Sequence, residues 1–237
     1  MEDIVNMIYN ESCISKDNCN MGGLQRIPTG SVDFVLTDPP YNIARDNNFT
    51  TMGRAGIDFG EWDKDADILS YIDELNRVTS KNGGVIIFND WKNLGMIADR
   101  LEHNGFVVKD CLRWIKTNPM PRNRDRRYIT DYEMAVWAVK KGSKWVFNRQ
   151  GDTYQRPEFK HSIVTGKNRI HPTQKPVALL EELIKIHTNE GSLILDPFMG
   201  SGSTAEACII TNRKYVGFER DETYYKASMK RLSACRQ

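Results

Sequence analysis

The sequence contains no apolar stretch that approaches the roughly 20 residues needed to span a bilayer. Residues 1–13 begin with acidic side chains and lack the basic region and apolar run of a signal peptide. We therefore expect a cytoplasmic protein with no membrane partner. The 237 residues suffice for one sizeable core, and 40% hydrophobic with 27% charged residues is an ordinary globular composition.

Cysteine is scarce and poorly spaced for covalent or metal chemistry. No CxxC pair occurs, so we expect neither a disulfide framework nor a metal site, and reduced thiols are the simplest interpretation. None of the cysteines follows a proline, which disfavours the Pro-Cys nucleophile of enzymes that methylate carbon 5 of cytosine. The cysteines are Cys13, Cys19, Cys111, Cys208 and Cys235.

An excess of charge of one sign is also missing. Lys and Arg number 33 against 31 Asp and Glu, and the net charge of +2 gives no global argument for a polyanionic partner. Internal repeats and low-complexity segments are absent as well. We expect residues 1–237 to form a single domain.

Apolar runs alternate with amphipathic ones, which is typical of an α/β fold with a mostly parallel sheet and helices on both faces. Long polar segments at 42–64, 117–131 and 148–175 should lie beyond the carboxyl ends of the strands. The expected strands are Val32–Thr37, Gly84–Asn89, Val107–Ile115, Met134–Lys140, Leu193–Asp196 and Tyr215–Glu219. The expected helices are Asp67–Thr79, Leu94–Asn104, Pro176–Thr188, Thr204–Asn212 and Glu222–Ala234.

The segment after Leu193–Asp196 has the features of a nucleoside-binding turn. The strand runs into Gly200 and Gly202 and then into a helix whose first N–H groups are free. Glu219 ends the next strand, about 20 residues further on, where a carboxylate can hold ribose hydroxyls. A third glycine at dinucleotide spacing is missing, so a pyrophosphate is less favoured. The motif alone does not separate NAD from S-adenosylmethionine.

A second strand ends directly in Asp38-Pro39-Pro40-Tyr41. The prolines fix the backbone and leave nearby carbonyls as rigid acceptors. A planar base could stack on Tyr41 while Asp38 and a carbonyl of Pro39 or Pro40 accept the two hydrogens of its amino group. Such hydrogen bonds free the amino lone pair for in-line attack on a sulfonium methyl, without a metal or a covalent enzyme intermediate. The bare tetrapeptide is also compatible with an ordinary turn.

Together these motifs resemble those of DNA amino-methyltransferases in the circularly permuted order called the beta class. TDPPYNI at 37–43 resembles the catalytic motif, and DPFMGSGST at 196–204 with VGFERD at 216–221 resembles the cofactor motif. HPTQKPVALLEELI at 171–184 is similar to the segment that covers the methionine part of the cofactor. The intermediate motifs correspond to 83–90, 114–121 and 132–140, and the likeness extends over about residues 6–231.

The resemblance implies a Rossmann-like class I methyltransferase fold with a seven-stranded sheet, S-adenosylmethionine as donor, and a DNA base flipped into the pocket. Asp38, rather than Ser, at the first catalytic position favours adenine N6 over cytosine N4. A bacterial or phage origin, a homodimer and a cognate restriction enzyme are further expectations from this likeness. The implied cofactor-site residues are Asp196, Pro197, Phe198, Gly200, Ser201, Gly202, Ser203, Glu219, His171, Thr173 and Lys175.

One position departs from the family pattern. The N-terminal strand of relatives usually carries an acid just before a cysteine, where it contacts the adenine ring of the cofactor. Here Ser12 precedes Cys13, so position 12 does not provide that contact. Whether Glu11 replaces it is open.

Basic residues cluster beside the predicted pocket despite the small net charge. They surround one strand end and its loop, where they would neutralise phosphates and steer DNA. Residues 142–170 leave room for only a short recognition insertion, which predicts a short or degenerate target sequence, and 42–64 should form a mobile loop over the bound base. The predicted DNA contacts are Arg113, Lys116, Arg122, Arg124, Arg126 and Arg127.

Two other functions remain open at the level of sequence. Related motifs act on bases of RNA, although the permuted order favours DNA. An inactive nucleic-acid-binding module would keep the same fold, although the intact segments 38–41 and 196–202 argue for catalysis.

Overall fold

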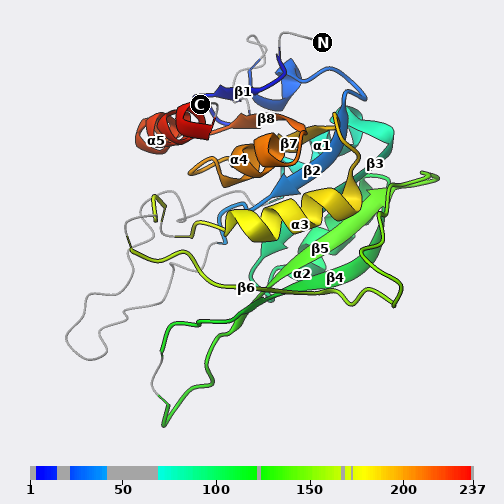
Figure 1. Cartoon of the computed structure of the whole chain (residues 1–237). Helices are drawn as coiled ribbons and strands as arrows, with labels where there is room; N and C mark the ends of the chain where they lie inside the picture. Colours follow the sequence, from blue (N-terminus) through cyan, green and yellow to red (C-terminus); the bar gives the residue numbers. More distant parts are fainter. Residues whose placement is uncertain are drawn as a thin grey trace.

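The computed structural model describes residues 4–14, 22–41, 69–121, 124–166, 169–171 and 173–235. These residues form an eight-stranded sheet with helices on both faces (Figure 1). The strand order is β1-β8-β7-β2-β3-β5-β4-β6; β5 is antiparallel to both neighbours and the other pairs are parallel. The strands are β1 Met7–Tyr9, β2 Val32–Thr37, β3 Thr79–Asn89, β4 Phe106–Lys116, β5 Tyr132–Lys140, β6 Glu158–His161, β7 Leu193–Asp196 and β8 Lys214–Phe218.

The predicted mostly parallel α/β sheet is confirmed, but the expected number of seven strands is wrong for the described residues. The additional strand is β6, which lies inside the 142–170 segment expected to be a recognition insertion and pairs in parallel with β4. Its sequence, Glu-Phe-Lys-His, lacks the apolar pattern of a strand, and only Phe159 is fully buried. Part of this segment therefore belongs to the edge of the sheet.

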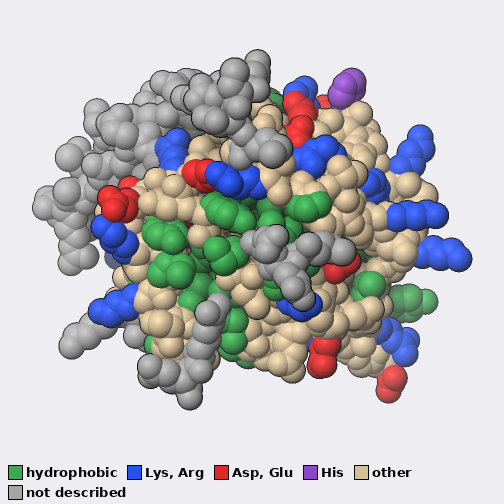
Figure 2. Space-filling model, turned by 90° about the horizontal axis from the view of Figure 1, so that it is seen from above, with side chains coloured by type: hydrophobic (Ala, Val, Ile, Leu, Met, Phe, Trp, Pro, Cys, Tyr) green, Lys and Arg blue, Asp and Glu red, His purple; other side chains and the backbone are tan. Residues whose placement is uncertain are grey.

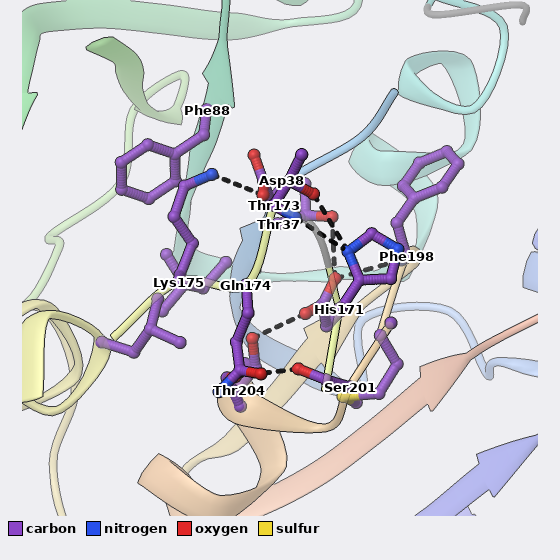
Figure 3. A pocket seen from close by; sticks show the side chains of 16 residues that line it. Thr37, Asp38, Phe88, His171, Thr173, Gln174, Lys175, Phe198, Ser201 and Thr204 are labelled. Carbon is purple, nitrogen blue, oxygen red and sulfur yellow. Dashed lines mark hydrogen bonds and ion pairs between the residues drawn. The ribbon is translucent and has the colours of Figure 1, made fainter. Parts of the chain in front are cut away.

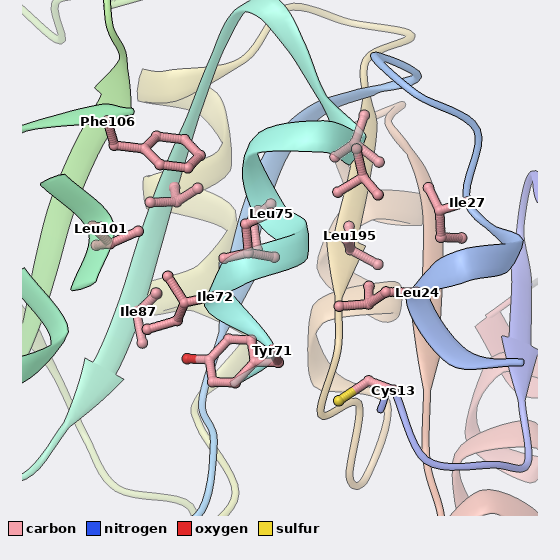
Figure 4. Packing of buried hydrophobic residues seen from close by; sticks show 14 of the residues in the cluster. Cys13, Leu24, Ile27, Tyr71, Ile72, Leu75, Ile87, Leu101, Phe106 and Leu195 are labelled. Atoms are coloured by element: carbon pink, nitrogen blue, oxygen red, sulfur yellow. The ribbon is translucent and has the colours of Figure 1, made fainter. Parts of the chain in front are cut away.

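Helices divide the core into two layers, one on each face of the sheet. Along β2, Val35 packs into one layer while Phe34 and Leu36 pack into the other. In the first layer, Leu75 of α1 lies over the sheet beside Leu195 of β7 (Figure 4). The first face is covered by α1 (Ile72–Val78), α2 (Leu94–His103) and the 3-10 helix Gly23–Arg26; the second by α3 (Val177–His187), α4 (Ser203–Ile210) and α5 (Glu222–Cys235).

The centre of the sheet determines where the functional segments meet. β2 lies between β7 and β3 and is parallel to both, with Phe34 opposite Ile194 and Val35 opposite Leu195. Parallel neighbours place their carboxyl ends at the same edge of a sheet. The DPPY segment after β2 and the glycine turn after β7 are therefore adjacent, as the sequence predicted.

The β1 edge of the fold, seen from above, shows hydrophobic side chains grouped among Lys and Arg side chains (Figure 2). In this part of the fold, Met7 of β1 is 43% exposed, Ile210 of α4 is 51% exposed and Met229 of α5 is 43% exposed. These exposed side chains do not test the expected homodimer, which stays a prediction.

Among the helices of the described residues, none combines the length and the apolar character required to cross a bilayer.

His187, the last residue of α3, is buried among aromatic rings. Its ring stacks on Phe34 at 5.4 Å between centroids and lies 4.8 Å from Trp137 and 5.7 Å from Phe147. Burial lowers its pKa to about 3, and its Nδ1 has no hydrogen-bond partner. Because the unfolded chain binds a proton at His187 below about pH 6.5 and the folded chain does not, acid favours unfolding.

We therefore expect His187→Phe to reduce the acid sensitivity of the fold. Relative to this variant, the wild-type free energy of unfolding should fall by about 2 kcal/mol between about pH 7.5 and about pH 5. Urea titrations at several pH values measure the difference, with the exposed His103→Gln as the matched control. Parallel curves for wild type and His187→Phe would contradict the assignment.

Gly202 ends the turn that leads from β7 into α4, and its φ of 78° lies in the left-handed region. A Cβ at this position would lie 3.0 Å from Ser228 Cβ of α5. Gly142 has a similar φ of 76°, but a Cβ there would have no atom within 4 Å. The two glycines thus share a backbone requirement and differ in packing.

We expect Gly202→Ala to destabilise the fold by at least about 1 kcal/mol more than Gly142→Ala, because only the former also meets α5. Urea unfolding of the two variants gives the difference directly. Equal losses would show that α5 yields to the added methyl group without cost.

Candidate active site

The ends of β2 and β7 are joined by a buried hydrogen bond. Thr37 Oγ1 donates to Asp196 Oδ1 at 2.8 Å, while the Phe198 N–H donates to Oδ1 at 3.0 Å and Thr204 Oγ1 to Oδ2 at 2.6 Å. Burial raises the pKa of Asp196 to about 6, against the effect of its three donors. Asp196 therefore ties the glycine turn to the neighbouring strand end.

A cavity of about 450 Å³ lies over the joined strand ends (Figure 3). This volume includes space that is open to solvent, so the cavity is an open cleft rather than an enclosed hole. Asp38 lines one part of the cavity and Gly200 another, so the shared cavity required for the predicted transfer is present. The predicted site residues that line it are Asp38, His171, Thr173, Lys175, Asp196, Phe198, Gly200, Ser201 and Ser203.

Other predicted site residues support the cavity without lining it. Glu219 Oε2 accepts the Gly200 N–H at 2.8 Å, and its Oε1 accepts the Asp221 N–H at 2.7 Å. A ribose hydroxyl would therefore have to share or replace these donors. The remaining predicted residues outside the lining are Pro39, Pro40, Tyr41, Pro197 and Gly202.

Several lining residues were missed by sequence reasoning. Phe88, near the end of β3, and Leu180, on α3, supply apolar walls and read as ordinary core residues in sequence. Gln174 lies within the motif at 171–184 and Thr204 within the motif at 196–204. Their neighbours in these motifs were predicted site residues, which could have indicated these two as well. Thr37, Leu36 and Met199 complete this group.

Asp38 belongs to a largely buried cluster of charges, in which Lys175 is buried and the other side chains are partly exposed. Lys175 Nζ lies 2.5 Å from Asp38 Oδ2 and 2.9 Å from Glu133 Oε2. Lys116 Nζ lies 2.7 Å from Glu133 Oε1, and the Tyr41 hydroxyl donates to Asp38 Oδ1 at 2.6 Å. Figure 3 shows the Lys175 ammonium directed at Asp38. Two ammonium groups thus balance two carboxylates.

The charges of this cluster depend on one another. Burial raises the pKa of Asp38, and the Lys175 ammonium opposes that rise. Burial also disfavours ionised Glu133, but Lys175 and Lys116 lower its pKa to about 2. Burial acts against the charge of Lys175 too, yet the two carboxylates raise its pKa above the ordinary value. Lys175 and Glu133 are therefore both charged.

Two predicted site residues have ion-pair partners that the sequence did not indicate. Lys175 was expected in the cofactor site; it lines the cavity, and its ammonium pairs with the carboxylate of Asp38. Lys116 was expected to contact DNA, but its side chain is 15% exposed and pairs with Glu133. Glu133 itself was not predicted, and its only signal in sequence is an acid at the start of an otherwise apolar strand.

The backbone after β2 is held by the next strand. Asn93 Nδ2 donates to the Tyr41 carbonyl at 3.0 Å and to Asn89 Oδ1 at 2.7 Å. Asn89 ends β3, and Asn93 immediately precedes α2. The two prolines and the hydrogen bond from Asn93 therefore both restrict the backbone of the DPPY segment.

His171 and Thr173 form a second wall of the cavity. Burial lowers the pKa of His171 to about 4, so its imidazole is neutral near pH 7. The Thr173 N–H donates to His171 Nδ1 at 3.3 Å, and the His171 ring meets Tyr224 edge-on at 4.2 Å. This wall of the cavity therefore offers a ligand hydrogen-bonding groups without a formal charge near pH 7.

Glu11, next to the N-terminal departure from the family pattern, makes local contacts in the structure. Its Oε1 accepts the Arg26 Nε–H at 2.7 Å and the Gly23 N–H at 3.1 Å. Ser12 Oγ accepts the N–H of Ile14 at 3.2 Å. Both side chains serve the local turn, and neither lines the cavity.

The predicted basic residues differ in their surroundings. Arg124, Arg126 and Arg127 are exposed on the β4–β5 connection, which projects away from the sheet (Figure 1). Arg113 pairs with Glu158 at 3.2 Å. Arg122 and the segment 42–64 lie outside the described residues.

Comparison with known proteins identifies the family of this chain. The sequence model of the DNA methylase family, for N6 and N4 enzymes, matches residues 32–230. The chain is 30% identical to the Type II methyltransferase M.HinfI of Haemophilus influenzae, covering 98% of this chain and 69% of that protein. It is 31% identical to the Type II methyltransferase M2.LlaDCHI of Lactococcus lactis subsp. cremoris, covering 89% and 85%.

Solved structures give the same result. The crystal structure of an M1.HpyAVI–SAM complex is 38% identical, with a TM-score of 0.75 and coverage of 95% of this chain and 98% of that chain. The cytosine-N4-specific PvuII DNA methyltransferase is 19% identical with a TM-score of 0.68, covering 88% and 82%, and supports the fold alone. With the catalytic segment and the glycine turn opening into one cavity, this chain belongs to the DNA amino-methyltransferase family.

Proposed function

We propose that this protein methylates the N6 amino group of adenine in DNA. The observation that carries the proposal is the single cavity that contains both Asp38 and the Gly200 turn. S-adenosylmethionine is the cofactor, and the chemistry that it supplies when bound is an electrophilic methyl group on a sulfonium. Asp38 at the first catalytic position supports adenine over cytosine by resemblance to the family.

The donor set of the cavity fits this cofactor. Phe198 offers an aromatic face to an adenine ring, and Gly200 and Ser201 leave the backbone open to close approach. His171 and Thr173 would lie against the methionine part and offer it hydrogen-bonding groups that carry no charge of their own. Glu219, which now holds the Gly200 N–H, is the acid placed to take ribose hydroxyls.

The catalytic end orients the target amine. Asp38 and a carbonyl of Pro39 or Pro40 accept its two hydrogens, which directs the nitrogen lone pair toward the glycine turn. Tyr41 supplies a ring face for stacking, and its phenol remains protonated because burial and Asp38 raise its pKa. Asp38 is also the nearest carboxylate to hold the proton that the amine loses. A base inside duplex DNA reaches this pocket by flipping.

Mass spectrometry of nucleosides from unmodified DNA, treated with the protein and cofactor, tests the proposal. We expect N6-methyladenine. Detection of N4-methylcytosine instead would show that the target is cytosine. Methylation of RNA but not of DNA would overturn the proposal.

Asp38→Ala should abolish product while cofactor binding, followed by calorimetry, stays within a few-fold of wild type. The reason is that the change removes the amine acceptor and leaves the glycine turn intact. Asp99→Ala, at an exposed position of α2, is the matched control and should keep full activity. Residual turnover in Asp38→Ala above a few per cent of wild type would exclude Asp38 as the main acceptor.

The exposed arginines of the β4–β5 connection are proposed to contact phosphates. We expect the double change Arg126→Ala and Arg127→Ala to weaken binding to all DNA sequences and to reduce the salt slope of log K by about two. Fluorescence anisotropy at several salt concentrations measures the slope. Lys226→Ala on α5, 70% exposed and paired with Glu222, is the control. An unchanged salt slope in the double variant would show that these two arginines do not contact DNA phosphates.

A further inference from the structure

The acceptor atoms that the target amine needs are already engaged. The Tyr41 hydroxyl donates to Asp38 Oδ1 at 2.6 Å, and the Lys175 ammonium donates to Oδ2 at 2.5 Å. Lys175 Nζ also lies 5.4 Å from the centre of the Tyr41 ring and 5.1 Å from that of Phe88. An ammonium and an exocyclic amine both present N–H donors, so Lys175 occupies the place of the amine beside the stacking ring.

We propose that the Lys175 ammonium occupies Asp38 in place of the target amino group until the base enters. Glu133 is then the positioning residue that remains paired with this ammonium after the amino group has displaced it from Asp38. The inference rests on the proposed function because both concern the same pocket.

Glu133 makes this exchange feasible. Lys175 has a side chain only 4% exposed, so releasing it from Asp38 without another partner would leave a buried, unpaired charge, which is costly. Its Nζ is already 2.9 Å from Glu133 Oε2. Lys116, 2.7 Å from Glu133 Oε1, holds the Glu133 carboxylate beside Lys175. The ammonium can therefore give up one carboxylate and retain the other.

Lys175 also controls the charge of Asp38. The groups that face Asp38 are Lys175 before α3, Glu133 of β5, Tyr41 of its own loop, Asp196 of β7 and the Tyr71 phenol next to α1. Among these described groups, Lys175 is the cation. Without it, the Asp38 carboxylate would remain in a desolvated site beside two other acids, and the neutral form would be favoured.

Lys175→Met separates this role from an ordinary structural one. We expect the acid limb of the pH profile of methyl transfer to move upward by at least about one pH unit, with activity recovered at higher pH. Adding Glu133→Gln to Lys175→Met should move the acid limb back to lower pH, because the negative charge of Glu133 no longer disfavours ionisation of Asp38. Lys185→Met, on the exposed side of α3, is the matched control and should keep the wild-type profile.

Glu133→Gln alone has a different signature. Lys175 then has one carboxylate partner and binds Asp38 more tightly, so the KM for DNA should rise several-fold with a smaller change in kcat. A fall in kcat with unchanged KM would overturn the role of Glu133 as the receiving group.

Carbon-13 NMR of labelled aspartate carboxyls gives a readout independent of catalysis, with Asp38→Asn identifying the signal. The Asp38 titration should move upward in Lys175→Met and return in the double variant. An unmoved titration, or a Lys175→Met protein that is inactive at every pH while Asp38 is ionised, would overturn the inference. A wild-type protein that transfers no methyl group to DNA would instead defeat the proposed function, and the titration would still decide the link between Lys175 and Asp38.

Discussion

The site depends on the hydrogen bond between Thr37 and Asp196. It joins the last residues of two neighbouring parallel strands, buried and at 2.8 Å. One strand continues into Asp38 and the other into the Gly200 turn, so this contact sets the separation of the two halves of the reaction. Asp196 is engaged by two further donors, Thr204 and Phe198. Asp196 therefore holds the turn in place in addition to lining the cavity.

The same edge of the sheet gathers a charge cluster from segments far apart in the chain. Asp38 follows β2, Lys116 ends β4, Glu133 is the second residue of β5 and Lys175 precedes α3. Buried ion pairs add little net stability, since desolvation offsets attraction, while removal of one partner is strongly unfavourable. Such a cluster is therefore better explained by what it does to Asp38 than by what it adds to the fold.

Sequence patterns were sufficient wherever one strand or turn carries its own signal. β2 and β7 begin and end at the predicted residues, because both are short apolar runs ended by an acid or a proline. β6 was missed because its polar residues hide a strand that only pairing with β4 reveals. The partners of Lys175 and Lys116 could not be predicted either, since a lone basic residue does not indicate which distant carboxylate it meets.

The pocket chemistry also limits where target choice can arise. In the proposed mechanism, Asp38 and the proline carbonyls accept hydrogen bonds from an amino group, and adenine and cytosine both carry one. Discrimination must then come from the size of the ring accepted between the apolar walls near Phe88 and from contacts to the surrounding DNA. Since part of 142–170 is taken into the sheet as β6, the exposed β4–β5 connection gains importance for those outer contacts. The proposed chemistry thus lies at the carboxyl ends of β2 and β7, and the proposed outer DNA contacts lie on the connection between β4 and β5.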